Sequence, residues 1–178
     1  MQRKFLEMLK LLQFLVVLIL SSNTVAERSI TNKPIDGAFG LKFGQVMPSD
    51  GMSSHDMYHE FLFRPKNTIE GVDEYYYNKS PVSNEIWRIG ATWKDKKGCR
   101  EKFNLLEKYF LKKYGERYSN NPDHPSWRDK EVNEIHLHCY SYGLGEGGAI
   151  VYLSDRFSRK TADEIQKMKL KKLEKVDL

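Results

Sequence analysis

Hydrophobic and polar residues alternate along several short stretches of this chain and recur at helical spacing in two others. Alternation with a period of two is typical of a β-strand that buries one face. The clearest example is "EIWRIGATW" at residues 85–93. One face of this strand is expected to carry Trp87, Ile89, Ala91 and Trp93, and the other Arg88, Gly90 and Thr92. Further strands are predicted at residues 57–65, 73–81, 132–142 and 149–154.

Two later segments have the spacing of amphipathic helices. After residue 98, apolar residues recur every three or four positions, which is the inward stripe of a helix. This stripe consists of Cys99, Phe103, Leu106, Phe110 and Tyr114. Gly115 follows where a helix end favours a left-handed residue. A final helix is predicted over residues 161–176, with Thr161 and Glu164 as its capping box.

Glycine-rich segments separate some of these elements. In "GAFGLKFG" at residues 37–44, the glycines are expected to form turns and the phenylalanines to pin the segment to the core. "GLGEGG" at residues 143–148 is expected to join two strands as a hairpin, because a strand rather than a helix follows it. The order βββαββα predicts an α+β domain, with an antiparallel sheet of about five strands and helices packed on one face.

The N-terminus has the pattern of a signal peptide. A basic start precedes ten uncharged residues at 11–20, which is too short an apolar run for the roughly 20 residues of a membrane span. Thr24 and Ala26 occupy the small-residue positions of a cleavage site. We therefore expect residues 1–26 to be removed and residues 27–178 to form a single secreted or periplasmic domain.

Charge adds little to this interpretation. The net charge of +5 falls when the basic N-terminal segment is removed, and acidic residues are interspersed among the remaining lysines and arginines. Such mixing is typical of a solvated surface. We expect no nucleic-acid partner, and membrane contact only through the signal peptide before cleavage.

Two cysteines, Cys99 and Cys139, remain after that cleavage. In an oxidising compartment the default is a disulfide between them. The loop that it would close corresponds to a stabilisation of roughly 4 kcal/mol by the chain-entropy account. A disulfide also leaves no free thiol for catalysis.

The cysteine pairing orients the strand at residues 132–142. If Cys139 faces the first helix, alternation places Ile135, Leu137, Cys139 and Ser141 on the buried side. The opposite side then carries His136, His138, Tyr140 and Tyr142. Arg88 is expected to join this second group, so the predicted binding residues are His136, His138, Tyr140 and Arg88.

A metal site is the alternative for the two histidines. His136 and His138 could supply two ligands, but a metal site needs a third and usually a fourth. His55, Asp56 and His59 are further candidates, although no spacing brings them to the pair. The sequence contains no G-x-S-x-G nucleophile motif, and it suggests no catalytic residue and no cofactor.

The chain also resembles a group of small, uncharacterised secreted bacterial proteins. The resemblance lies in the segment "GAFGLKFG" and in "KYG" after a cysteine-containing helix, and it spans most of residues 37–154. It supplies no activity for this chain. We therefore expect an exported, non-enzymatic binding or accessory domain that acts on a protein or cell-envelope component. The alternative is a metal-dependent hydrolase or metal-binding protein.

Export makes a direct prediction about the N-terminus of the mature protein. N-terminal sequencing of the exported form should start at or near Glu27, because the small residues of the cleavage site end at Ala26. Recovery of the full-length chain from the cytosol would contradict this expectation.

Overall fold

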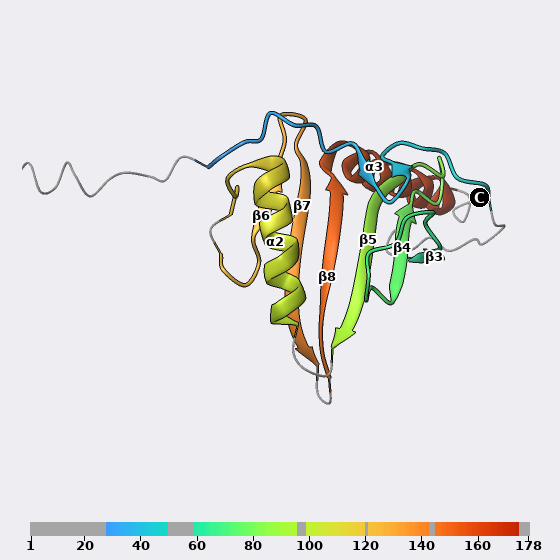
Figure 1. Cartoon of the computed structure of the whole chain (residues 1–178). Helices are drawn as coiled ribbons and strands as arrows, with labels where there is room; N and C mark the ends of the chain where they lie inside the picture. The colour runs from blue at the N-terminus through green and yellow to red at the C-terminus, as the bar shows by residue number, and fades with distance from the viewer. Residues whose placement is uncertain (1–27, 50–58, 96–98, 120, 143–144, 175–178) are drawn as a thin grey trace, which may run out of the picture.

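The computed structural model describes residues 28–49, 59–95, 99–119, 121–142 and 145–174 (Figure 1). In chain order the elements are β1 (Gly37–Ala38), β2 (Leu41–Lys42), β3 (Phe61–Phe63), β4 (Glu74–Lys79), β5 (Ile86–Asp95), α2 (Arg100–Tyr114), β6 (Ser126–Arg128), β7 (Asn133–Tyr142), β8 (Gly145–Ser154) and α3 (Asp155–Leu173). The predicted signal peptide lies outside the described residues. Among those described, no helix is long and apolar enough to cross a membrane.

The predicted α+β fold with an antiparallel sheet is confirmed. In the described part of the chain, six strands form the main sheet in the order β3-β4-β5-β8-β7-β6, and β1 pairs with β2 in a separate hairpin. The sixth strand, β6, lies in a segment for which the sequence predicts no strand. It is only three residues long, so it has no readable alternation, and it is held by packing: Trp127 is fully buried, with its ring centroid 5.1 Å from that of Phe110.

Helix α2 and the β1–β2 hairpin pack on one face of the sheet, which we call the inner face. The predicted stripe of α2 is buried there, and Gly115 ends the helix with a φ of 85°. The hairpin comes from the glycine-rich segment, and Phe39 at its turn packs edge-on against Tyr75 and Tyr152. The prediction that these phenylalanines join the core is confirmed.

Strand β5 departs from simple alternation at one residue. Asn78 pairs with Arg88 and Lys79 pairs with Ile86, so the register passes over Trp87. An extra residue of this kind is a β-bulge, which turns a side chain to the other face. The prediction that Trp87 shares a face with Trp93 is therefore wrong: Trp93 is in the inner core, whereas Trp87 lines a pocket with Glu134 on the opposite face.

Helix α3 begins six residues earlier than predicted, directly after β8. Ser154 is its N-cap, and Thr161 is buried within the helix, so the predicted capping box is wrong. Glu164 instead accepts hydrogen bonds from Ser80 (2.5 Å) and Ser83 (3.0 Å) in the turn between β4 and β5. These contacts hold α3 at one end of the strands (Figure 1).

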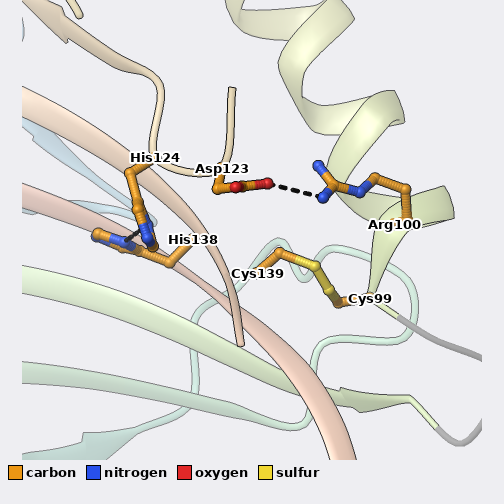
Figure 2. Close-up of a disulfide and its surroundings, with 6 residues drawn as sticks. All are labelled: Cys99, Arg100, Asp123, His124, His138 and Cys139. Carbon is orange, nitrogen blue, oxygen red and sulfur yellow. Dashed lines mark hydrogen bonds and ion pairs between the residues drawn. A yellow bond between two sulfur atoms is a disulfide. The ribbon is translucent and has the colours of Figure 1, made fainter. Parts of the chain in front are cut away.

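The predicted disulfide between Cys99 and Cys139 is present, with a Cα–Cα distance of 5.7 Å (Figure 2). Cys99 immediately precedes α2, and Cys139 lies on β7. Next to the bond, Arg100 pairs with Asp123 at 2.9 Å, which ties the loop before β6 to the start of the same helix. The bond thus joins the start of α2 to β7, the strand next to the edge strand β6.

Removing the disulfide is expected to destabilise the fold without changing its topology. A Cys99→Ser, Cys139→Ser double variant should lose about 2 to 4 kcal/mol of unfolding free energy, because the bond restricts the unfolded chain. Urea unfolding of both proteins under oxidising conditions measures the difference. Equal stability, or two alkylatable thiols in the wild-type protein, would contradict the expectation.

Candidate functional site

The four predicted binding residues lie on the face of the sheet opposite α2, which we call the outer face. His136, His138 and Tyr140 alternate along β7 with Ile135 and Leu137, which are 0 % exposed in the inner core. The predicted phase of β7 is therefore confirmed. The rings of His136 and His138 are stacked, with centroids 5.9 Å apart and an interplanar angle of 7°. All three outer side chains are half-buried rather than fully exposed.

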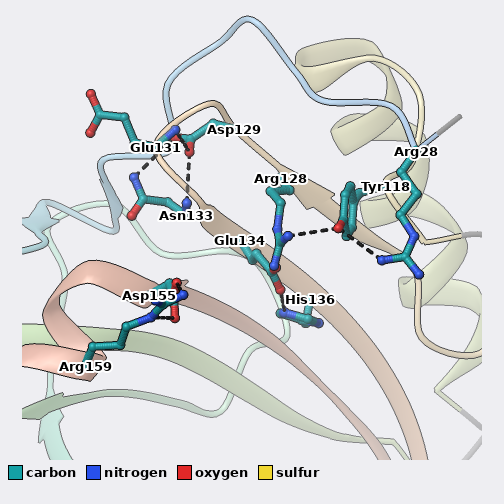
Figure 3. A network of polar contacts seen from close by, with 10 residues as sticks. All are labelled: Arg28, Tyr118, Arg128, Asp129, Glu131, Asn133, Glu134, His136, Asp155 and Arg159. Carbon is teal, nitrogen blue, oxygen red and sulfur yellow. Dashed lines mark hydrogen bonds and ion pairs between the residues drawn. The ribbon is translucent and has the colours of Figure 1, made fainter. Parts of the chain in front are cut away.

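His136 belongs to a continuous polar network (Figure 3). Its Nε2 lies 2.6 Å from a carboxylate oxygen of Glu134, and Arg128 donates from Nε to the other oxygen at 2.5 Å. Arg128 also donates to the Tyr118 hydroxyl at 2.8 Å. The hydrogen bond from His136, together with Arg128, lowers the pKa of the Glu134 carboxyl against the opposing effect of burial. Glu134 is thus an anion held between two donors.

His138 makes its polar contact with a residue outside the sheet. The Nδ1 atoms of His138 and His124 are 2.9 Å apart (Figure 2). One of these nitrogens has to carry the hydrogen and the other the lone pair. Burial lowers the pKa of His138 to about 4, and the neighbouring His136, His124 and Arg88 act in the same direction. His138 is therefore neutral at physiological pH.

Arg88 and Tyr140 lie in the part of the outer face that contains tyrosine rings. Arg88 donates to the Tyr76 hydroxyl at 2.9 Å, and its guanidinium lies 5.1 Å from the centre of the same ring. Tyr76 crosses the neighbouring strand where Gly90 leaves room, because a β-carbon there would overlap the ring. Tyr140 crosses Gly147 in the same way, at 2.9 Å from the place of a β-carbon. Glycine on one strand thus lets a large side chain lie flat over it.

A pocket of about 380 Å³ adjoins the network where α3 begins. Trp87 and Leu153 supply apolar surface to it, and Arg128, Glu134, Asp155 and Arg159 supply charge. Arg159 pairs with Asp155 within α3 (Figure 3). Arg128 is paired with Glu134 and Arg159 with Asp155, so the charges in this pocket are balanced. The pocket can therefore form hydrogen bonds with a ligand but has little net charge.

The described part of the chain contains no complete set of ligands for the alternative metal site. No group of three or more histidine, cysteine, aspartate or glutamate side chains there could hold a metal ion. His59 packs on Phe61 beside β3, at the other edge of the sheet from β6. His55 and Asp56 lie outside the described residues.

Sequence reasoning missed several members of the outer face. Glu134 could have been found, because it stands two residues before His136 and alternation places both on one side. His124, Tyr118 and Arg128 have no such signal. They reach the site through the pairing of β6 with β7 and through the loop that precedes β6.

Protonation of His138 is expected to destabilise the protein in mildly acidic solution. Its pKa is about 4 in the folded chain and about 6.5 in an unfolded one. As the pH falls, the unfolded state binds the proton first, so the stabilisation present above pH 6.5 is lost as the pH approaches 4. Unfolding free energies measured across this interval should show the loss. A His138→Gln variant should lose less unfolding free energy over this interval. The same pH profile for the variant and the wild type would contradict the low pKa assigned to His138.

Comparison with known proteins identifies no relative of this chain. No protein-family model matches the chain, and no curated protein or solved structure is significantly similar to it. The resemblance to small secreted bacterial proteins stays a prediction. The function has to be inferred from the residues of the chain itself.

Proposed function

We propose that this chain is an exported, non-enzymatic binding or accessory domain that recognises a protein or cell-envelope component through its outer face. The observation that carries the proposal is the row of histidine, tyrosine and arginine side chains on β5 and β7, held in place by defined partners. Tyrosine and arginine are enriched at recognition surfaces because they combine contact area with polar groups.

The fixed geometry of these side chains favours binding. Arg88 is held by Tyr76 and Glu60, and His136 by Glu134, so their rotamers are restricted before any partner arrives. Side chains ordered in advance lose less entropy on association. The side chains of His136 and Arg88 remain 25 % and 23 % exposed, which leaves their edges open to contact.

The chemistry of the face suggests how a partner would be held. His138 is neutral, and the Glu134 carboxylate is already paired with Arg128, so the central part of the face presents hydrogen-bonding groups and aromatic edges. Such a surface suits a polar partner with planar or apolar groups, such as a peptide segment or a glycan of the envelope. It does not depend on a strong net charge.

Capture from a solubilised cell-envelope extract tests the proposal. The immobilised wild-type chain should retain a specific component, and a His136→Ala, His138→Ala double variant should bind that component about tenfold more weakly, as expected for a central contact. Arg88→Gln, which leaves both histidines in place, should weaken it in the same direction. Circular dichroism confirms that each variant is folded.

A matched control lies on the other side of the molecule. Lys108 and Lys112 are exposed on α2, so a Lys108→Ala, Lys112→Ala variant should retain the component as the wild type does. Equal capture by the wild type, the control and both outer-face variants would show that this face is not the binding surface. A metal ion retained by the wild type and lost from the double histidine variant would favour the metal-binding alternative.

A further inference from the structure

A groove of about 1010 Å³ opens on the inner side of the molecule. Its walls are α2, the β1–β2 hairpin and the connection from β3 to β4 at residues 63–69, and Tyr152 of β8 lies at its base. The volume is at the upper end of the range of about 300 to 1,000 Å³ that is usual for ligand pockets. None of the residues proposed to bind on the outer face lines it.

The walls of the groove are largely apolar, and part of this surface is open to water. Leu105 and Tyr109 line the groove from α2 and are 69 % and 54 % exposed, although both are large apolar or aromatic side chains. Phe39 forms the opposite wall. A concave surface of this kind gains free energy when an apolar ligand displaces water from it.

The hairpin wall is held in one conformation before any ligand binds. Phe39 has a φ of 54°, which is uncommon for a residue other than glycine. The flanking Gly37 and Gly40 also have positive φ, and a β-carbon on Gly37 would overlap the backbone at Leu41. This turn presses the Phe39 ring onto Tyr75, at 4.9 Å, and onto Tyr152, at 5.7 Å.

Among the described residues, every charged side chain that lines the groove is basic. They are Arg64, Lys66 and Lys113, from two different walls. Within the described residues, no carboxylate forms an ion pair with any of the three. Lys113 lies over the rings of Tyr114 and Tyr109, at 4.8 and 5.9 Å from their centres. An anion at the mouth of the groove would therefore meet cations that no carboxylate among the described residues neutralises.

The base of the groove adds a hydrogen-bond donor. Tyr152 is 7 % exposed, and no described residue hydrogen-bonds to its hydroxyl. Burial, and to a smaller extent Tyr114 and Tyr109, raises the pKa of this phenol, so it keeps its proton. A ligand oxygen that reaches the base of the groove can accept a hydrogen bond from this hydroxyl.

We propose that this groove binds an anionic amphiphile, namely an acyl chain that carries a carboxylate or phosphate head group. The apolar walls of α2 and the hairpin enclose the acyl chain. Arg64, Lys66 and Lys113 attract the head group at the mouth, and the acyl chain extends along the apolar walls towards Tyr152. This site is independent of the proposed outer face, so either proposal can fail alone.

Calorimetric titration of the purified chain with three probes tests the site. Decanoate and decyl phosphate, both kept below their micelle-forming concentrations, should bind with saturation at one site per chain. Decanol, which has the same tail without charge, should bind at least about tenfold more weakly. Added salt should weaken the binding of the two anions and not that of decanol. The preferred anion identifies the head group as carboxylate or phosphate.

Variants of the groove have matched controls on the same helix. An Arg64→Gln, Lys113→Gln variant should bind decanoate roughly three- to tenfold more weakly, whereas Lys112→Gln, one residue outside the groove, should bind like the wild type. Leu105→Ser should weaken all three probes, and Leu111→Ser should weaken none.

Three results would overturn the proposal. The first is the absence of saturable binding by both anions. The second is equal binding of decanol and decanoate, which would mean that the basic rim selects nothing. The third is a dimer in size-exclusion chromatography that Leu105→Ser dissociates, because the groove would then be occupied by a second copy of the chain.

Discussion

The disulfide between Cys99 and Cys139 is the constraint on which the orientation of the sheet depends. Side chains alternate along β7, so turning Cys139 towards α2 also turns Leu137 inward and His138 outward. A shift of one residue would exchange the two sets, placing histidines against the core and leucine in water. The covalent bond and the burial of Leu137 act in the same direction, which gives this strand a single stable phase.

The fixed orientation divides the molecule into two faces with different chemistry. The inner face is aromatic and apolar, and the groove with the three basic side chains opens on it between α2 and the hairpin. The outer face is polar, but its side chains are only partly hydrated. Half-buried polar groups require partners, and the series from Tyr118 through Arg128 and Glu134 to His136 provides them. The same partners restrict the motion of these side chains.

The loop before β6 connects the disulfide to the outer face. Arg100 follows Cys99 at the start of α2 and pairs with Asp123, and the next residue, His124, contacts His138 across the edge of the sheet (Figure 2). A covalent bond on the inner side thereby helps to position a histidine on the outer side. The low pKa of His138 follows from its burial and from the nearby His136, His124 and Arg88, of which the loop contributes His124.

The sequence alone predicted the features that depend on local periodicity. The stripe of α2, the phase of β7 and the pairing of the two cysteines each follow from residues a few positions apart or from the number of cysteines. Glu134 could have been added to the site by the same alternation. These features are local because a helix or strand presents its side chains at a fixed spacing.

Tertiary structure decided the rest. The bulge that moves Trp87 to the outer face arises from the register between β4 and β5, and β6 exists because Trp127 packs on Phe110. Helix α3 starts at Asp155, directly after β8, and Glu164 of the predicted cap instead contacts a turn that is distant in the chain. His124 and the groove beside Tyr152 bring together segments far apart in the chain. Such contacts depend on how the elements pack, and no local pattern in the sequence encodes them.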